Sequence, residues 1–327
     1  MHETPPNPES ENTPGRVADS IDGNWVDRHA PPWTRPYLRL SRADRPIGSW
    51  LLLLPCWWSL PLAIMTTSTA SILGTLWIAL ACAIGAILMR GAGCSWNDFA
   101  DRKLDAEVRR TRSRPLPSGQ ITPIHALIWM VIQALLAFAL LLTFKPFAIG
   151  LGIAALIPVA FYPFAKRVSW WPQIFLGIAF NWGALLAWAA IAGKISPGAL
   201  LLYATGIFWT LFYDTIYAHQ DREDDGLIGI RSTARLLGTH TKFWLAGFAV
   251  AAVLLMVMAI TIALIPHTDL KVVLIALGGA IVFGIHLTWQ LVKLDISNPD
   301  NCLMLFRANR DAGLLPVVFF AVAALVA

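Results

Sequence analysis

The sequence predicts an all-α protein, a polytopic membrane helical bundle of about nine transmembrane helices with a central site opening to the cytoplasmic side. Three observations lead to this prediction. Hydrophobic residues make up 57% and charged residues 14% of the 327 residues, whereas a soluble domain carries roughly 25% charged residues. The apolar residues form separate runs close to the ~20 residues that a helix needs to cross a bilayer. The charged residues gather in alternate connections between these runs.

The expected spans follow one another to the end of the chain. In order they lie near residues 47–65, 71–96, 123–143, 146–165, 171–192, 197–219, 242–265, 270–292 and 303–326. Thr122-Pro123 and Ser196-Pro197 are each typical of an N-cap followed by proline at the first helical position, so they predict helix starts. Asn181 lies in the middle of its span, where we expect a hydrogen bond to a neighbouring helix.

A polar segment precedes the spans. Residues 1–34 are rich in Pro, Asn, Glu and Asp, and we expect a disordered polar tail there, before one intramembrane domain over residues 35–327. The segment contains no secretory signal, and its acids argue against a mitochondrial transit peptide. The cysteines lack metal-ligand spacing and are expected to be small buried hydrophobes: Cys56, Cys82, Cys94 and Cys302.

The charge distribution predicts an orientation. Basic clusters follow the second, fourth, sixth and eighth spans, and further arginines precede the first span, whereas the other connections hold almost no charge. By the positive-inside rule the N-terminus and the charged connections face the cytoplasm, and the C-terminus lies outside.

The first acidic cluster follows the second span, in "SWNDFADRKLDAEVRRTRSRPLPSG" at residues 95–119. Asn97, Asp101 and Asp105 are spaced i, i+4 and i+8, so a continuing helix would place them on one face. Asp98 lies beside them.

The second acidic cluster, "FYDTIYAHQDREDDGLIGIRSTAR" at residues 212–235, follows the sixth span. Spacings of 3, 4 and 7 put its acids and one tyrosine on one helical face: Asp214, Tyr217, Asp221, Asp224 and Asp225. A solvated loop of balanced charges is the alternative interpretation of both clusters. It does not explain Asp214, which lies within the apolar run, where a carboxylate is costly without a partner.

Two facing carboxylate patches would repel each other unless cations lay between them. Mg²⁺ prefers carboxylate and water oxygens and usually completes its shell with substrate phosphates. Acidic clusters flanked by Arg and Lys therefore indicate a diphosphate site, and a site within a membrane bundle indicates a long hydrocarbon on the ligand. A prenyl diphosphate fits both features.

These two clusters resemble the motifs of the UbiA family of intramembrane prenyltransferases. "NDFADRKLDAEVRRTRSRPLPSG" is similar to the first family motif and "DTIYAHQDREDDGLIGIRSTA" to the second. "RADRPIGSWLLLLPCWWSL" and "YPFAKRVSWWPQIFLG" resemble the 4-hydroxybenzoate polyprenyltransferase branch in particular. The resemblance covers the chain from Arg39 to the C-terminus.

The resemblance implies a set of site residues. The Mg²⁺ ligands would be Asn97, Asp98, Asp101, Asp105, Asp221, Asp224 and Asp225. The diphosphate would meet Arg102, Arg114, Lys166, Arg167 and Arg231. Arg42 or Arg45 would bind the acceptor carboxylate, with membrane-side anchoring as the alternative role of both.

The implied reaction is transfer of a polyprenyl group to the ring carbon ortho to the hydroxyl of 4-hydroxybenzoate, with release of diphosphate, in ubiquinone biosynthesis. Asp101 and Asp221 would act through the metal, and Asp214 would orient the hydroxyl or receive a proton, or else join the metal shell. Aromatic faces could stabilise an allylic cation; the candidates are Trp96, Phe212, Tyr213 and Tyr217. Core packing is the alternative role of each of these rings.

Other functions stay open at this point. One is a relative that prenylates another acceptor, such as a naphthoate, homogentisate or haem. A transporter is disfavoured because the acids gather at one interface rather than at the membrane midplane. The expected partners are the two substrates and the lipid bilayer, not nucleic acid, and the expected location is a bacterial inner membrane, or alternatively the mitochondrial one. The sequence does not indicate the prenyl chain length or the oligomeric state.

Overall fold

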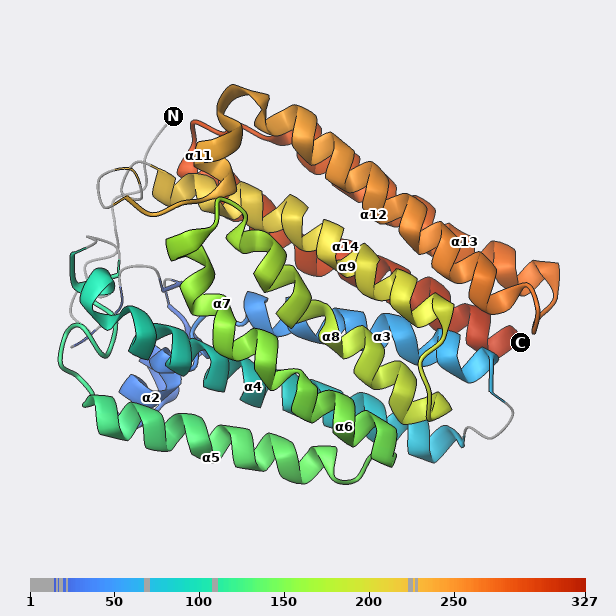
Figure 1. Cartoon of the computed structure of the whole chain (residues 1–327), viewed down its shortest axis with the longest axis horizontal. Coiled ribbons are helices and arrows are strands. Elements are labelled where there is room, and N and C mark those ends of the chain that lie inside the picture. The colour runs from blue at the N-terminus through green and yellow to red at the C-terminus, as the bar shows by residue number, and fades with distance from the viewer. Residues whose placement is uncertain are drawn as a thin grey trace. The chain divides into compact units, whose positions relative to one another are not determined.

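The computed structural model describes residues 15, 17, 20–21, 23–67, 71–107, 111–222, 226 and 229–327, apart from the side chain of Lys166. Every regular element within these residues is a helix (Figure 1). The elements are α1 (Trp25–His29), α2 (Arg35–Leu40), α3 (Ile47–Met65), α4 (Ile72–Glu107), α5 (Pro123–Leu141), α6 (Pro146–Ala154), α7 (Leu156–Val168), α8 (Pro172–Ala192), α9 (Pro197–Ala218), η1 (His219–Asp221), α11 (Thr233–Leu237), η2 (Gly238–His240), α12 (Thr241–Leu264), α13 (Leu270–Lys293) and α14 (Pro299–Val326).

The predicted helical membrane fold is confirmed. Within the described ranges, 9 helical segments are long and apolar enough to cross a membrane, and they match the predicted spans in order. Ser196 caps α9 as expected, because its side chain accepts a hydrogen bond from the Ala199 amide. The cysteines are buried and unpaired by disulfides, as expected.

Two helices differ from the predicted bounds. α4 does not end near residue 96 but continues to Glu107, through the first acidic cluster. The fourth span is broken at Ala155 into α6 and α7. Pro158 explains the break, because a proline ring clashes with the carbonyl four residues earlier, here that of Ala154.

The chain divides into two compact units. The first unit comprises Met1–Gly48 and Ile87–Phe138, and the second comprises Ser49–Ala86 and Ala139–Ala327. The backbone passes between them within α3, α4 and α5.

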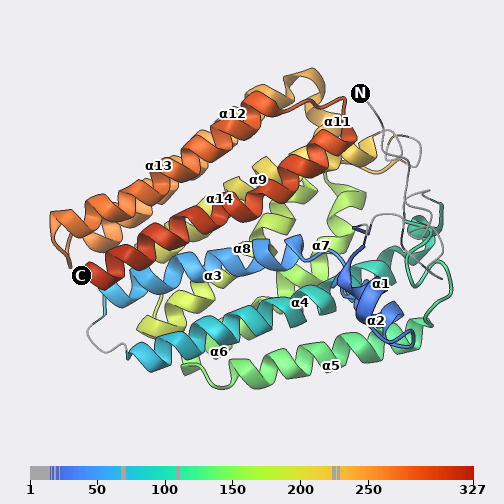
Figure 2. The ribbon, with the colours of Figure 1, turned by 180° about the vertical axis from the view of Figure 1, so that it is seen from behind.

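Within the second unit, α9 packs against α8, α12 and α14, and α13 packs against α12 and α14. Figure 1 shows α12 and α13 side by side, and Figure 2 shows α14 running along the same group of helices from behind. The core contains three buried rings, with Trp58 5.0 Å from Trp209 and both within 6 Å of Phe283. Both indole N–H groups are satisfied, Trp58 by the Gly313 carbonyl and Trp209 by Asn309 Oδ1, as a membrane interior requires.

Asn181 forms the predicted interhelical hydrogen bond. Its Nδ2 donates to Thr210 Oγ1 at 2.8 Å, which joins α8 to α9, and also to the Gly177 carbonyl of its own helix. Because both partners are buried, this bond satisfies a polar group that lipid could not.

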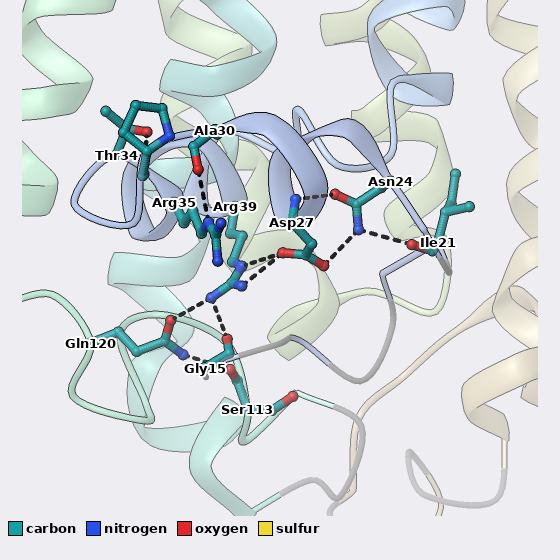
Figure 3. A network of polar contacts seen from close by, with 11 residues as sticks. Gly15, Ile21, Asn24, Asp27, Ala30, Thr34, Arg35, Arg39, Ser113 and Gln120 are labelled. Atoms are coloured by element: carbon teal, nitrogen blue, oxygen red, sulfur yellow. Dashed lines mark hydrogen bonds and ion pairs between the residues drawn. The ribbon is translucent and has the colours of Figure 1, made fainter. Parts of the chain in front are cut away.

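In the first unit, the described part of the N-terminal segment is folded, although composition predicts disorder there. α1 begins at the N-cap Asn24 and buries Val26. Figure 3 shows why: the buried Arg39 side chain donates two hydrogen bonds to Asp27 and one each to the Gly15 carbonyl and Gln120 Oε1. One buried guanidinium thus ties the segment before α2 to the connection after α4.

Candidate active site

The first acidic cluster lies on the last turns of α4. The helix continues to Glu107, so the i, i+4, i+8 placement of Asn97, Asp101 and Asp105 on one face is confirmed. The exposed fractions of Asp98, Asp101 and Asp105 are 0%, 0% and 6%. A helix C-terminus disfavours negative charge, and burial adds to the cost. These carboxylates therefore need cations nearby.

Two arginines supply positive charge, one from the turn between α2 and α3 and one from the connection after α4. Arg42 Nη2 lies 2.6 Å from Asp98 Oδ1. Arg114 Nη1 lies 3.4 Å from the same oxygen and 3.0 Å from Asp105 Oδ2. Thr111 Oγ1 donates to the Asp105 carbonyl and so holds the connection that carries Arg114 against the end of α4. The guanidinium groups of Arg42 and Arg114 therefore lie beside two of the acids that are predicted to bind a metal, Asp98 and Asp105.

One oxygen of Asp98 remains available. Oδ2 is buried and has no hydrogen-bond partner among the residues that the structure describes. A buried acceptor without a donor is costly, so this atom suits a cation that would arrive with the substrate.

The other cations predicted in the first unit make different contacts. Arg45 Nε lies 3.5 Å from Asp44 Oδ1. Arg102 is exposed, donates to the Phe99 carbonyl of its own helix and covers the Phe99 ring at 4.7 Å. Asp44 was missed by the sequence reasoning, although an acid within the basic stretch "RADRP" is a signal that could have revealed it.

The second acidic cluster begins on α9 and continues into η1. Asp214 lies in α9 and Asp221 ends η1, and both are partly buried. The Tyr217 ring packs against Phe306 in a tilted arrangement, with 4.4 Å between ring centroids. Asp224 and Asp225 lie outside the described residues.

The aromatic candidates of this region contribute to the core. Phe212 and Tyr213 are fully buried, and the Tyr213 ring lies 5.2 Å from Trp209 and 5.9 Å from Phe306. Trp96, on α4 in the first unit, stacks on Phe99. These contacts agree with the packing role that sequence reasoning left open for them, and their catalytic role stays a prediction.

Three arginines of the second unit gather around the end of α7. Arg231 is exposed, donates to the Val168 carbonyl at 2.8 Å and lies over the Trp170 ring. Arg235 lies over the same ring at 5.6 Å, and Arg167 covers Phe164. Arg235 was also missed, although it follows Arg231 by four residues in "IGIRSTAR". Lys166 precedes Arg167 on α7, and its side chain is not among the groups that the structure describes.

Within the described residues, no group of three His, Cys, Asp or Glu side chains could hold a metal ion alone. Mg²⁺ does not need such a group, because it commonly uses one or two carboxylates with water and substrate phosphate oxygens. Buried carboxylates with one open acceptor on Asp98 fit that mode of binding. The joint site of both clusters and its cytoplasmic opening stay predictions.

Comparison with known proteins identifies related chains. The UbiA prenyltransferase family matches over residues 52–310. The 4-hydroxybenzoate polyprenyltransferase, mitochondrial, of Bos taurus is 44% identical over 302 residues, which are 90% of this chain and 77% of that protein. The human protein of the same name is 45% identical with the same coverage, and that of Arabidopsis thaliana is 40% identical over 90% of this chain and 70% of its own length.

Solved structures share the fold at lower identity. A UbiA homologue from Aeropyrum pernix K1 has a TM-score of 0.67 at 21% identity, covering 84% of this chain and 98% of its own. A UbiA homologue from Archaeoglobus fulgidus, solved bound to DMAPP and Mg²⁺, has a TM-score of 0.62 at 19% identity, covering 89% and 99%. At these identities the likeness concerns the fold.

Proposed function

The chain belongs to the UbiA prenyltransferase family, and on that premise we propose that it transfers a polyprenyl group from an all-trans polyprenyl diphosphate to 4-hydroxybenzoate, in ubiquinone biosynthesis. The new bond forms at the ring carbon ortho to the hydroxyl, and diphosphate leaves. One observation carries the proposal: relatives named 4-hydroxybenzoate polyprenyltransferase are 40 to 45% identical over 90% of the chain. The protein is thus a multi-pass membrane enzyme.

Divalent metal, proposed to be Mg²⁺, would neutralise the charge that develops on the departing diphosphate. Asn97, Asp98, Asp101 and Asp105 would hold it from the first cluster, and Asp221, Asp224 and Asp225 from the second. The open Asp98 oxygen and the buried carboxylates on α4 support this assignment. Arg102, Arg114, Lys166, Arg167 and Arg231 would bind the remaining diphosphate charge.

The chemistry at the acceptor needs one carbon–carbon bond and one proton transfer. The allylic C–O bond breaks with its electrons going to diphosphate, the phenol ring attacks the allylic carbon, and the ring loses a proton. Asp214 would receive that proton or orient the hydroxyl, and Tyr217 would border the substrate. Water must be excluded from the allylic cation, and Phe212 and Tyr213, which are buried next to Asp214 in the sequence of α9, would contribute to this.

The acceptor carboxylate requires a cation. Arg42 and Arg45 both remain proposed for it. Arg42 lies 2.6 Å from Asp98 of the first acidic cluster, whereas Arg45 lies 3.5 Å from Asp44, which is not a proposed metal ligand. These contacts favour Arg45.

Two lines of support bear on which membrane holds the protein. Sequence reasoning favours a bacterial inner membrane with a cytoplasmic N-terminus, whereas the relatives' names support the mitochondrial alternative. Fractionation of the native organism's membranes would distinguish these locations.

The test of function uses membranes that contain the whole protein, labelled 4-hydroxybenzoate, a set of all-trans prenyl diphosphates, and either Mg²⁺ or EDTA. We expect metal-dependent product, and we expect Asp101→Ala or Asp221→Ala to lower kcat by about 10²-fold or more, as loss of transition-state charge stabilisation does. Asp269→Ala, on an exposed connection, is the matched control and should keep activity.

Three outcomes would contradict the proposal. Equal product formation in EDTA and in Mg²⁺ would show that the reaction does not need a divalent metal. Full activity in both aspartate variants would remove the acidic clusters from the mechanism. Product with a naphthoate or homogentisate but not with 4-hydroxybenzoate would change the acceptor.

A further inference from the structure

The turn after α2 has an unusual residue at its centre. The Arg42 amide donates to the Arg39 carbonyl and the Ala43 amide to the Leu38 carbonyl, which is the hydrogen-bond pattern of a Schellman motif. Its left-handed position is usually occupied by glycine, because a Cβ is disfavoured there. Here it is occupied by Arg42, with a φ of 59°. No other non-glycine residue in the described part of the chain has a positive φ.

The side chain of Arg42 explains why an arginine occupies this position. It is buried, and Nη1 donates to the carbonyls of Arg39 and Leu40, so it caps the end of the helix that it follows. Nη2 donates to Asp98 Oδ1 at 2.6 Å. Strained backbone is retained where its surroundings over-determine it, and it often marks a functional site.

The base of this turn is fixed independently. Arg39, whose carbonyl accepts from Arg42, is itself held by Asp27, Gly15 and Gln120 (Figure 3). α2 is therefore anchored through Arg39, three residues before the turn that carries the Arg42 guanidinium.

The contact defines which Asp98 oxygen is available. Arg42 and Arg114 both bind Oδ1, and Arg114 continues to Asp105. Oδ2 is left without a hydrogen-bond partner among the described residues. A carboxylate held through one oxygen by a fork of fixed geometry is pre-oriented for a ligand at the other.

We propose that Arg42 is a positioning residue, whose left-handed turn orients the Asp98 carboxylate and the first acidic cluster, rather than the cation that binds the acceptor carboxylate. This proposal rests on the proposed function, since it assigns Arg42 to the metal-diphosphate side of that reaction.

The test compares Arg42→Gly, Asp98→Asn and the double variant, with the exposed Arg307→Gln as control. Glycine suits the left-handed position, so Arg42→Gly relieves the strain and the protein is expected to fold. We expect kcat to fall about tenfold or more while the KM for 4-hydroxybenzoate changes less than about threefold, and the double variant to be no worse than the worse single variant.

Mn²⁺ binding in the presence of diphosphate, followed by electron paramagnetic resonance, separates positioning from charge. Removing a cation from an acidic cluster should tighten Mn²⁺ binding by simple Coulomb attraction. Loss of orientation should weaken it. We expect weaker binding in Arg42→Gly, by about threefold or more.

Several results would overturn the proposal. These are tighter or unchanged Mn²⁺ binding, a KM for 4-hydroxybenzoate that rises about tenfold at constant kcat, or fully additive losses in the double variant. If the wild-type protein forms no product, the proposed function fails. The metal-free protein then still tests the Arg42–Asp98 pair through its thermal-unfolding temperature. The shifts caused by Arg42→Gly and Asp98→Asn should be strongly non-additive in the double variant. Additive shifts would overturn the proposed coupling between the two residues.

Discussion

The acidic side chains at the end of α4 are buried in a place where both the helix dipole and desolvation oppose negative charge. Their stability depends on guanidinium groups that come from outside α4, those of Arg42 and Arg114. Arg114 is the clearest example, because a single Nη1 bridges Asp98 and Asp105. Removing it leaves Asp105 buried without that ion pair.

We therefore expect Arg114→Ala to lower the free energy of unfolding by about 2–4 kcal/mol, as loss of one member of a buried pair does. Arg102→Ala is the matched control, because Arg102 is exposed and contacts its own helix, and its effect should stay within about 0.5 kcal/mol. Both are measured by unfolding in detergent without metal. Equal effects of the two substitutions would show that the ion pairs of Arg114 do not hold the cluster.

At the scale of the elements, α8 and α9 approach closely at Gly206. A Cβ placed on Gly206 would overlap the Asn181 side chain from its Cβ to Oδ1, so the glycine makes room for the Asn181–Thr210 hydrogen bond. Small residues at helix contacts and interhelical hydrogen bonds are the usual means of helix association in membranes.

Gly206→Ala should therefore destabilise the protein by about 1–3 kcal/mol, because Asn181 must move and lose its bond to Thr210. Gly247→Ala on α12 is the matched control, since a Cβ there meets no atom within 4 Å, and a better helix former should be neutral or stabilising by up to about 1 kcal/mol. Asn181→Ala combined with Gly206→Ala should recover part of the loss. A loss unchanged in the double variant would place the clash elsewhere.

For the whole molecule, the sequence predicts most of what depends on local composition. The predicted helix starts at Pro123 and Pro197 follow from proline and capping chemistry, and the predicted interhelical partner of Asn181 is confirmed. α4 is longer than predicted because hydropathy ends at Trp96, whereas ion pairs with residues outside the helix stabilise its charged extension. Arg42 pairs with Asp98 across 56 residues of sequence, and Arg114 pairs with Asp105 across 9.

The remaining differences have the same physical origin. α1 was missed because Arg39 orders it through contacts with Asp27 and Gln120, which no window of composition contains. The conformation of Arg42 depends on Asp98 in the same way. Long-range ion pairs decide both features, and a single sequence does not display them.

The orientation of the whole chain is the last prediction, and it follows from charge alone. The connection between α13 and α14 lies within a basic stretch from Lys293 to Arg310, whereas the connection between α12 and α13 has little charge. The positive-inside rule therefore places Ser297 in the cytoplasm and His267 outside. Both residues are exposed and all native cysteines are buried, so Ser297→Cys and His267→Cys give single reactive thiols with little background. An impermeant maleimide applied to intact cells or organelles should label His267→Cys at once and Ser297→Cys only after the membrane is opened. The reverse pattern would invert the topology and place the acidic clusters on the opposite side of the membrane.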